Sequence, residues 1–170
     1  MTALDISPTM IELAKATTEK ELHFAEPAED RLSFHVCDYE SPFNFGKFDA
    51  AVIYDALHHA ENEAAVIKNV HSALEPGGIF ITMEPGKGHS KEAHSIEAMK
   101  RFGVTEKDME YDRQRGFMLS AGFSEVRQFA RLSELALFDL SKDAGKKQGD
   151  YLNGLLMNTV SAVAVASSSR

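Results

Sequence analysis

The chain has 170 residues, 44% of them hydrophobic and 26% charged, a balance typical of a globular domain and not of a disordered or fibrous chain. Its 18 basic and 26 acidic residues give a net charge of -8, which disfavours general binding to nucleic-acid phosphates. A single cysteine, Cys37, excludes an intrachain disulfide and a thiolate zinc site. With no signal-peptide pattern and no long apolar run, we expect one cytoplasmic domain over residues 1–170 that has no membrane span.

The first part of the sequence alternates short strands with helical patterns. Residues 2–5 predict a strand, and Ser7 and Pro8 suit the start of the helix that follows. Residues 32–36 alternate apolar and polar side chains, as a half-buried strand does. The run 50–54 is apolar throughout, which is typical of a central strand in a parallel sheet.

The second part contains further strands and helices. Strands are expected over residues 79–83, 126–132 and 161–166, and helices over 61–75, 91–101 and a stretch ending at Ala121. Thr105 and Asp108 have the spacing of a capping box for that last helix. The polar segment 142–150 predicts a hairpin-like or disordered stretch.

This alternation predicts an α/β fold of three layers, with a mostly parallel sheet between helices. We expect the strands near residues 2–5, 32–37, 50–54 and 79–83 to lie parallel in one sheet, and the last two strands to be partly antiparallel. Ligands of such sheets bind at the carboxyl ends of the strands. The candidate site residues should therefore follow those ends.

Two acidic residues stand at predicted strand ends. Asp5 could accept hydrogen bonds from the hydroxyls of a ribose, or it could cap the following helix. Asp38 could accept from the amine of an adenine, or it could form a turn. Either carboxylate alone is compatible with both roles.

Three segments in order resemble class I S-adenosylmethionine-dependent methyltransferases, and most of all their small-molecule branch. Residues 4–14 resemble the family's second strand and following helix, and residues 48–59 its fourth strand and the turn after it. Residues 74–83 resemble its leucine-x-proline-glycine-glycine segment and fifth strand. The resemblance implies a Rossmann-like methyltransferase fold, S-adenosylmethionine as cofactor, and methyl transfer to a small molecule.

The resemblance also implies site residues. Cofactor contacts are expected from Asp5, Ile6, Asp38, Tyr39 and Asp55. A histidine just after a strand end could take a proton from the methyl acceptor, and His58 and His59 stand there. In the alternative interpretation, both histidines have structural roles: one packs in the core and the other caps the next helix. Glu84 and His89 are expected to contact the acceptor, and no helical metal-ligand spacing predicts a metal site.

One feature of that family is not found in these residues. Its glycine-rich turn, G-x-G-x-x-G, does not occur, and the nearest match, Gly86-Lys87-Gly88, follows a different strand. We therefore expect an N-terminally truncated domain that lacks one strand, the turn and one helix. The strands at 2–5 and 50–54 would then pair directly or leave open edges, which favours a homodimer.

Two other functions remain open. A chain without the glycine-rich turn could be a non-catalytic methyltransferase-like domain for binding or assembly. A nucleotide-dependent oxidoreductase also uses a carboxylate to hold a ribose. The Pro76-Gly77-Gly78 segment and the paired histidines favour the methyltransferase.

Overall fold

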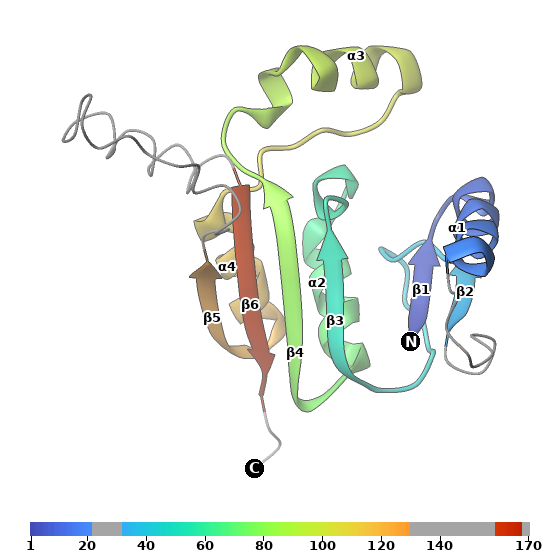
Figure 1. Ribbon diagram of the computed structural model, residues 1–170. Coiled ribbons are helices and arrows are strands. Elements are labelled where there is room, and N and C mark those ends of the chain that lie inside the picture. Colours follow the sequence, from blue (N-terminus) through green and yellow to red (C-terminus); the bar gives the residue numbers. More distant parts are fainter. Residues whose placement is uncertain (22–31, 130–158, 168–170) are drawn as a thin grey trace, which may run out of the picture. The chain divides into compact units, whose positions relative to one another are not determined.

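The computed structural model describes residues 1–21, 32–129 and 159–167. These residues fall into two compact units, Met1–Gly46 and Lys47–Arg170, and each is described by itself (Figure 1). The expectation of a single domain over residues 1–170 stays a prediction. Within the described residues, no helix combines the length and apolar character that crossing a bilayer requires.

The N-terminal unit is a two-stranded parallel sheet with one helix. Strand β1 (Thr2–Asp5) pairs with β2 (Ser33–Val36), and helix α1 (Pro8–Glu21) connects to β1 and contacts both strands. The hydroxyl of Ser7 accepts a hydrogen bond from the amide of Met10 at 3.3 Å, which confirms the predicted start of this helix.

The C-terminal unit is built on a four-stranded sheet in the order β3-β4-β6-β5. Strands β3 and β4 are parallel, while β6 is antiparallel to both of its neighbours. In chain order, its elements are β3 (Phe48–Tyr54), the short 3-10 helix η2 (Leu57–His59), α2 (Glu63–Ala73), β4 (Leu74–Pro85), the 3-10 helix η3 (His89–Lys91), α3 (Ala93–Phe102), α4 (Tyr111–Ala121), β5 (Phe123–Phe129) and β6 (Thr159–Ala166).

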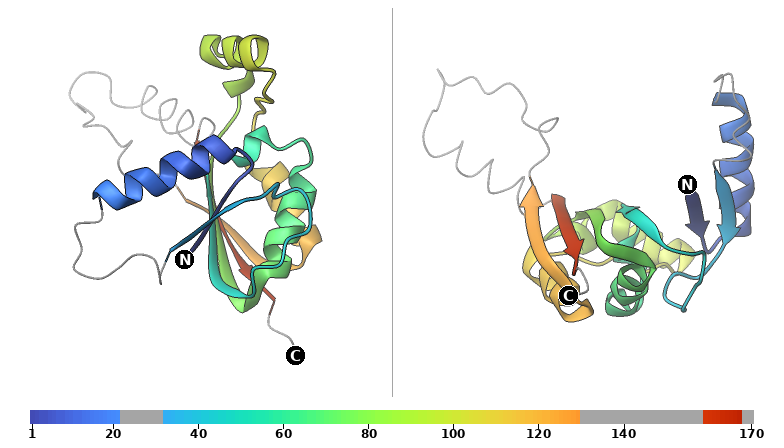
Figure 2. Two further views of the ribbon diagram at one scale, coloured as in Figure 1. Left: turned by 90° about the vertical axis from the view of Figure 1, so that its right-hand side faces the viewer. Right: turned by 90° about the horizontal axis from the view of Figure 1, so that it is seen from below.

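Helices α2 and α4 lie side by side on one face of this sheet, as the view from below shows (Figure 2). From Gly78 onward, every second residue of β4 is buried in the core beneath them, with Phe80 and Thr82 fully buried. The ring of Phe80 stacks on Phe123 of β5 at 5.7 Å. The period-two pattern of a half-covered strand therefore decides which β4 side chains are buried.

The expectation of one continuous sheet is wrong for the described residues. Strands β1 and β2 form their own sheet, and β3 is an edge strand of the four-stranded sheet. Its side chains Val52 and Tyr54 are 65% and 58% exposed, although the apolar run predicts burial on both faces. An apolar run indicates that a strand tends to be buried. Among the described strands, however, β3 has a neighbour on one side alone, which is β4. The predicted segment 142–150 lies outside the described residues, and the homodimer stays a prediction.

Gly122, which ends α4, offers a test of the packing between that helix and α2. Its φ is +110°, and a Cβ there would lie 3.0 Å from the ring of His71. Gly122→Ala is therefore expected to lower the free energy of unfolding by about 1–3 kcal/mol, measured by urea denaturation. The matched control is Gly116→Ala, inside α4 and with nothing near its Cβ, which should stabilise the chain by about 0.5–1 kcal/mol. Equal effects of the two substitutions would contradict the prediction.

Candidate functional site

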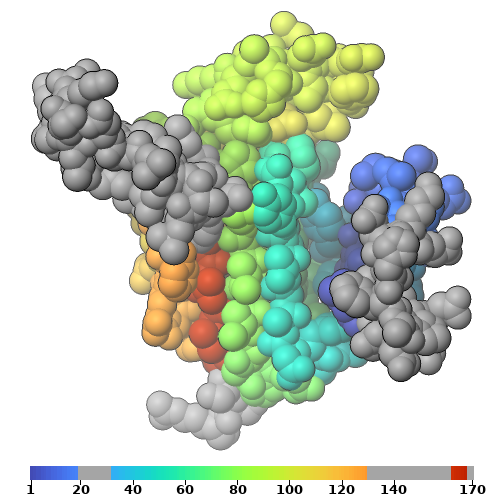
Figure 3. All heavy atoms as spheres, viewed as in Figure 1, coloured from blue at the N-terminus to red at the C-terminus, as the bar shows by residue number. Residues whose placement is uncertain are grey.

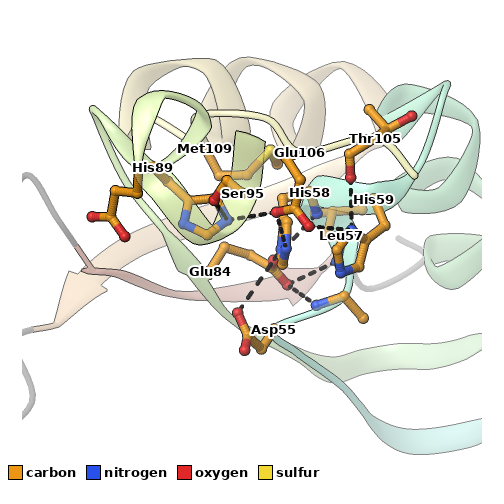
Figure 4. A network of polar contacts seen from close by, with 12 residues as sticks. Asp55, Leu57, His58, His59, Glu84, His89, Ser95, Thr105, Glu106 and Met109 are labelled. Carbon is orange, nitrogen blue, oxygen red and sulfur yellow. Dashed lines mark hydrogen bonds and ion pairs between the residues drawn. The ribbon is translucent and has the colours of Figure 1, made fainter. Parts of the chain in front are cut away.

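The carboxylate of Glu84, near the carboxyl end of β4, organises the turn that follows β3. It is buried and accepts hydrogen bonds from the backbone amides of Ala56, Leu57 and His58 at 3.3, 3.0 and 3.2 Å. It also contacts Nδ1 of the His58 ring at 2.8 Å (Figure 4). Because a carboxylate in this setting only accepts, His58 carries a hydrogen on Nδ1, and its Nε2 points elsewhere.

A second buried carboxylate, Glu106, faces three imidazole rings. Its Oε2 lies 2.7 Å from Nε2 of His89 and 3.5 Å from Nε2 of His58, and its Oε1 lies 3.8 Å from Nδ1 of His59. The His58 and His59 ring centroids are 3.9 Å apart, and those of His58 and His89 are 5.0 Å apart. We call His58, His59, His89, Glu84 and Glu106 the histidine cluster (Figure 4).

The members of the histidine cluster differ in exposure. The side chain of His58 is 4% exposed, that of His89 13% and that of His59 41%. Nδ1 of His59 lies 2.7 Å from the carbonyl oxygen of Thr105, so in neutral His59 the hydrogen is on Nδ1 and the lone pair is on Nε2. His59 is thus the cluster histidine best placed to meet a ligand.

The extended segment 103–110, which we call the strap, supplies Thr105 and Glu106 and is fixed to the rest of the unit. The ammonium of Lys107 donates to the carbonyls of Ala60 and Glu61, and the amide of Met109 donates to the carbonyl of Pro85. The strap thus holds its two polar residues over the end of the sheet.

Asp108 in the strap corrects one expectation. Its carboxylate accepts hydrogen bonds from the amides of Gly88 and Ser90 at 2.9 and 2.8 Å, so it caps η3. The predicted capping box of Thr105 and Asp108 is wrong, because α4 begins only at Tyr111. Partial burial opposes the charge of Asp108, but the two amides, the Ser90 hydroxyl and the charge of Lys91 outweigh burial and lower its pKa.

Asp108→Asn tests this cap. A carboxyl whose pKa is lowered by folding stabilises the folded state above its ordinary value of about 3.9, and this contribution is lost as the pH falls through the lower folded value. At pH 7 the Gly88 and Ser90 amides should exchange hydrogen about tenfold faster in the variant, which corresponds to losing one charged hydrogen bond. Below the folded pKa the two proteins should converge. Asp112→Asn, on the exposed side of α4, is the control, and equal exchange at pH 7 would refute the cap.

Asp55 follows β3 in a left-handed conformation, with φ at +51°. Its amide donates to the carbonyl of Met83, and its carboxylate is 64% exposed and 3.9 Å from Nδ1 of His58. A left-handed aspartate is uncommon and is held here by the strand pairing beside it. The carboxylate of Asp55 is therefore accessible for the cofactor contact that the sequence analysis expects.

The remaining expected cofactor residues lie in the N-terminal unit. Oδ1 of Asp5 accepts from the amide of Ser7 at 2.7 Å, and Ile6 beside it is 63% exposed. The two oxygens of Asp38 accept from the Glu40 amide and the Ser41 hydroxyl, which close a turn that includes the half-buried Tyr39. Both aspartates thus have the structural roles given as alternatives above: Asp5 binds the start of the helix and Asp38 forms a turn. The structure brings together His58, His59, Glu84 and His89, and it describes Asp5, Ile6, Asp38 and Tyr39 in the other unit.

Metal binding is a possible use of the histidine cluster. His58, His59 and Glu106 offer ligand atoms within 4.8 Å of one another, and so do Asp55, His58 and Glu84. In the second group, the Glu84 carboxylate already accepts four N–H donors, so a cation there would have to displace them. The observed contacts are those of a hydrogen-bond network.

Sequence reasoning missed Glu106 and the strap. Both histidines follow the end of β3 and Glu84 lies near the end of β4, so the topology of a parallel sheet predicts that they meet. Glu106 comes from a stretch with no predicted strand, and the capping-box motif predicted there involves Thr105 and Asp108 instead. The signal left for Glu106 is the density of charged residues between Thr105 and Glu110.

Comparisons with known proteins relate the chain to methyltransferases. Residues 1–82 match the model of a methyltransferase domain family. Demethylmenaquinone methyltransferases of two strains of Leptospira interrogans are 24% identical to the chain over 172 residues, and the match covers 96% of this chain. The chain spans 64% of the length of these curated relatives.

Solved structures show the same fold. An S-adenosylmethionine-dependent methyltransferase from Mesorhizobium loti matches with a TM-score of 0.65 at 19% identity, covering 96% of this chain and 79% of that one. Phosphoethanolamine N-methyltransferase 2 of Haemonchus contortus, in complex with S-adenosylmethionine, matches with a TM-score of 0.63 at 16% identity, covering 99% and 43%. A complex of the Haloferax volcanii Trm112 methyltransferase activator with a methyltransferase matches with a TM-score of 0.65 at 20% identity, covering 99% and 72%.

Proposed function

Because the chain has the fold of class I S-adenosylmethionine-dependent methyltransferases and a methyltransferase domain match over residues 1–82, we propose that it transfers a methyl group from S-adenosylmethionine to a small molecule. The observation that carries the proposal is the histidine cluster at the carboxyl ends of β3 and β4, where ligands of such sheets bind. The named activity of the curated relatives makes demethylmenaquinone the first acceptor to try.

The chain's own residues fit the cofactor unequally. Asp5 is half-buried at the carboxyl end of β1, and its second oxygen has no hydrogen bond to another described residue, so it can accept from a ribose. Asp38 uses both oxygens in its turn and would meet an adenine through its remaining lone pairs. Ile6, Tyr39 and Asp55 stay proposed cofactor contacts. When bound, the cofactor supplies an electrophilic methyl group on sulfur.

On the acceptor side, His59 is the proposed general base. Its Nδ1 is held by the carbonyl of Thr105, so the lone pair on Nε2 is available, and the ring is partly exposed. His58 lies behind it, with its orientation set by Glu84. We assign Glu84 to positioning the histidines, and His89, beside Glu106, to the edge of the acceptor site. Positioning then contributes most of the rate of the in-line displacement.

Isothermal titration with S-adenosylhomocysteine tests the cofactor side. We expect binding in the high-micromolar range or weaker for the 170-residue chain, because its sequence holds no G-x-G-x-x-G turn and association costs several kcal/mol of lost freedom. Asp5→Ala should weaken binding about tenfold, since a charged hydrogen bond is worth about 1.5–3 kcal/mol. Asp49→Ala, an exposed aspartate of β3, is the control.

The outcomes separate the possible functions. Methyl transfer to demethylmenaquinone, followed with a labelled methyl group, would establish the enzyme. Binding that is unchanged by Asp5→Ala would remove the ribose assignment. No binding of the cofactor at millimolar concentration would favour the non-catalytic alternative.

A further inference from the structure

Resting on the proposed methyl transfer, we propose that Glu106 is a positioning residue of the reaction, which stabilises the positive charge that the histidine cluster gains when the acceptor loses its proton. The inference also narrows the substrate class, because only an acceptor that loses a proton during methyl transfer needs such a group. Its basis is the place of one buried carboxylate among three imidazoles.

The carboxylate oxygens of Glu106 face histidine rings. The side chain is 8% exposed, and its two oxygens face His58, His59 and His89 at distances from 2.7 to 3.8 Å. The nearby cation Lys107 does not neutralise it, because its ammonium is directed to the carbonyls of Ala60 and Glu61 and to the carboxylate of Glu63. The charge of Glu106 therefore acts chiefly on the histidines.

The hydrogen positions show what a proton would change. Nδ1 of His58 donates to Glu84, so in neutral His58 the lone pair of Nε2 faces Oε2 of Glu106 at 3.5 Å. Two acceptors that face each other in a buried site repel. The short contact between His89 and the same oxygen needs one hydrogen between them. An added proton on the cluster turns the unfavourable pair into a charged hydrogen bond.

Other ionisable groups face the same rings. Glu84 contacts His58 from β4, Asp55 lies 3.9 Å from its Nδ1, and the ring of the exposed His94 lies tilted beside that of His89 with centroids 5.5 Å apart. The carboxylates among them also favour a protonated cluster. Glu106 differs from them because it faces all three histidines, His59 included.

The step balances without a further reactant. The proton leaves the acceptor atom that is to be methylated for Nε2 of His59, and the electron pair left behind forms the bond to the methyl carbon. The bond between that carbon and sulfur breaks, and its electron pair stays on sulfur. The charge on His59 then faces Oε1 of Glu106 and the carbonyl of Thr105.

The test compares Glu106→Gln, which keeps the shape and removes the charge, with Glu110→Gln, an exposed glutamate of the same segment. Nitrogen-15 NMR of the imidazoles, with signals assigned through His58→Asn, His59→Asn and His89→Asn, reports where their hydrogens lie. At a fixed pH, we expect the ring-nitrogen shifts of the cluster to move toward those of neutral imidazole in Glu106→Gln, to stay in place in Glu110→Gln and to be largely restored in Glu106→Asp.

Turnover and binding complete the test. Glu106→Gln should lower kcat about tenfold to a hundredfold and leave S-adenosylhomocysteine affinity within about twofold. A Glu106→Gln variant that loses activity while its ring-nitrogen shifts stay in place would overturn the inference and leave Glu106 a purely structural role. If the protein transfers no methyl group to any acceptor, the proposed function fails, whereas the ring-nitrogen shifts still decide whether Glu106 acts on the cluster.

Discussion

Glu84→Ala is expected to lower the free energy of unfolding by about 3–5 kcal/mol, the cost of breaking a buried charged network by removing one partner. The carboxylate accepts hydrogen bonds from three backbone amides and from the ring of His58, and alanine would remove the acceptor of these four donors, three of which are buried. Turnover should fall as well, since η2 and both of its histidines lose their orientation. Chemical denaturation and the pattern of backbone amide shifts around residues 56–59 measure the two effects.

Two further variants sharpen this prediction. Glu84→Gln keeps one acceptor oxygen but turns an NH2 group toward the N–H donors, so its cost should be smaller and still clear. Glu75→Ala removes an exposed glutamate from the same strand and should change stability by less than about 0.5 kcal/mol. A Glu84→Ala protein as stable as the Glu75→Ala protein would show that the carboxylate does not hold the turn.

Replacing His58 and His59 together with asparagine is expected to reduce turnover by about a hundredfold to ten-thousandfold, the usual contribution of general base catalysis. Cofactor binding should stay within a few-fold. His59→Asn alone should account for most of this loss, because His59 is the partly exposed member. His58→Asn should instead cost stability, because its ring is buried against Glu84. The measurement is the initial rate of methyl transfer beside the unfolding free energy of each variant.

Two controls limit the interpretation. His94→Asn changes a histidine that is 69% exposed and should leave turnover unchanged. Cys37→Ser should also be neutral, because burial and the charge of Asp38 raise the pKa of the Cys37 thiol and keep it protonated near neutral pH. Unchanged turnover in the double histidine variant would return both histidines to packing and capping.

The sequence predicts most elements of this fold because each carries a local signal. Ser7 and Pro8 mark the start of α1, and Gly103 and Gly122 end α3 and α4 with left-handed backbone. Sheet membership has no such signal. The apolar run of β3 is identical whether the strand lies in the centre of a sheet or at its edge, so its neighbours could not be read from it.

The candidate site was predictable for the residues at strand ends and was missed for those of the strap. His58 and Glu84 come from the ends of two adjacent parallel strands, and the sheet itself brings them together. Asp108 and Glu106 act through contacts with residues 17 to 20 positions earlier in the chain, across a helix, and local patterns do not record such pairs. The capping-box spacing at Thr105 and Asp108 matched a motif, but the aspartate is used by a different helix start.

The helix α3 lies beyond the carboxyl ends of β3 and β4 (Figures 1 and 3). Hydrogen bonds join the residues before this helix to those after it: Asp108 accepts from the amide of Ser90, and Glu106 contacts the ring of His89. Of α3 itself, only Ser95 is buried. Lengthening a closed loop costs little, about 0.6 kcal/mol per doubling. Residues 93–102 can therefore be exchanged or extended with small loss of stability. This segment is a suitable place to introduce side chains that change the acceptor specificity, and a place where length can vary between relatives.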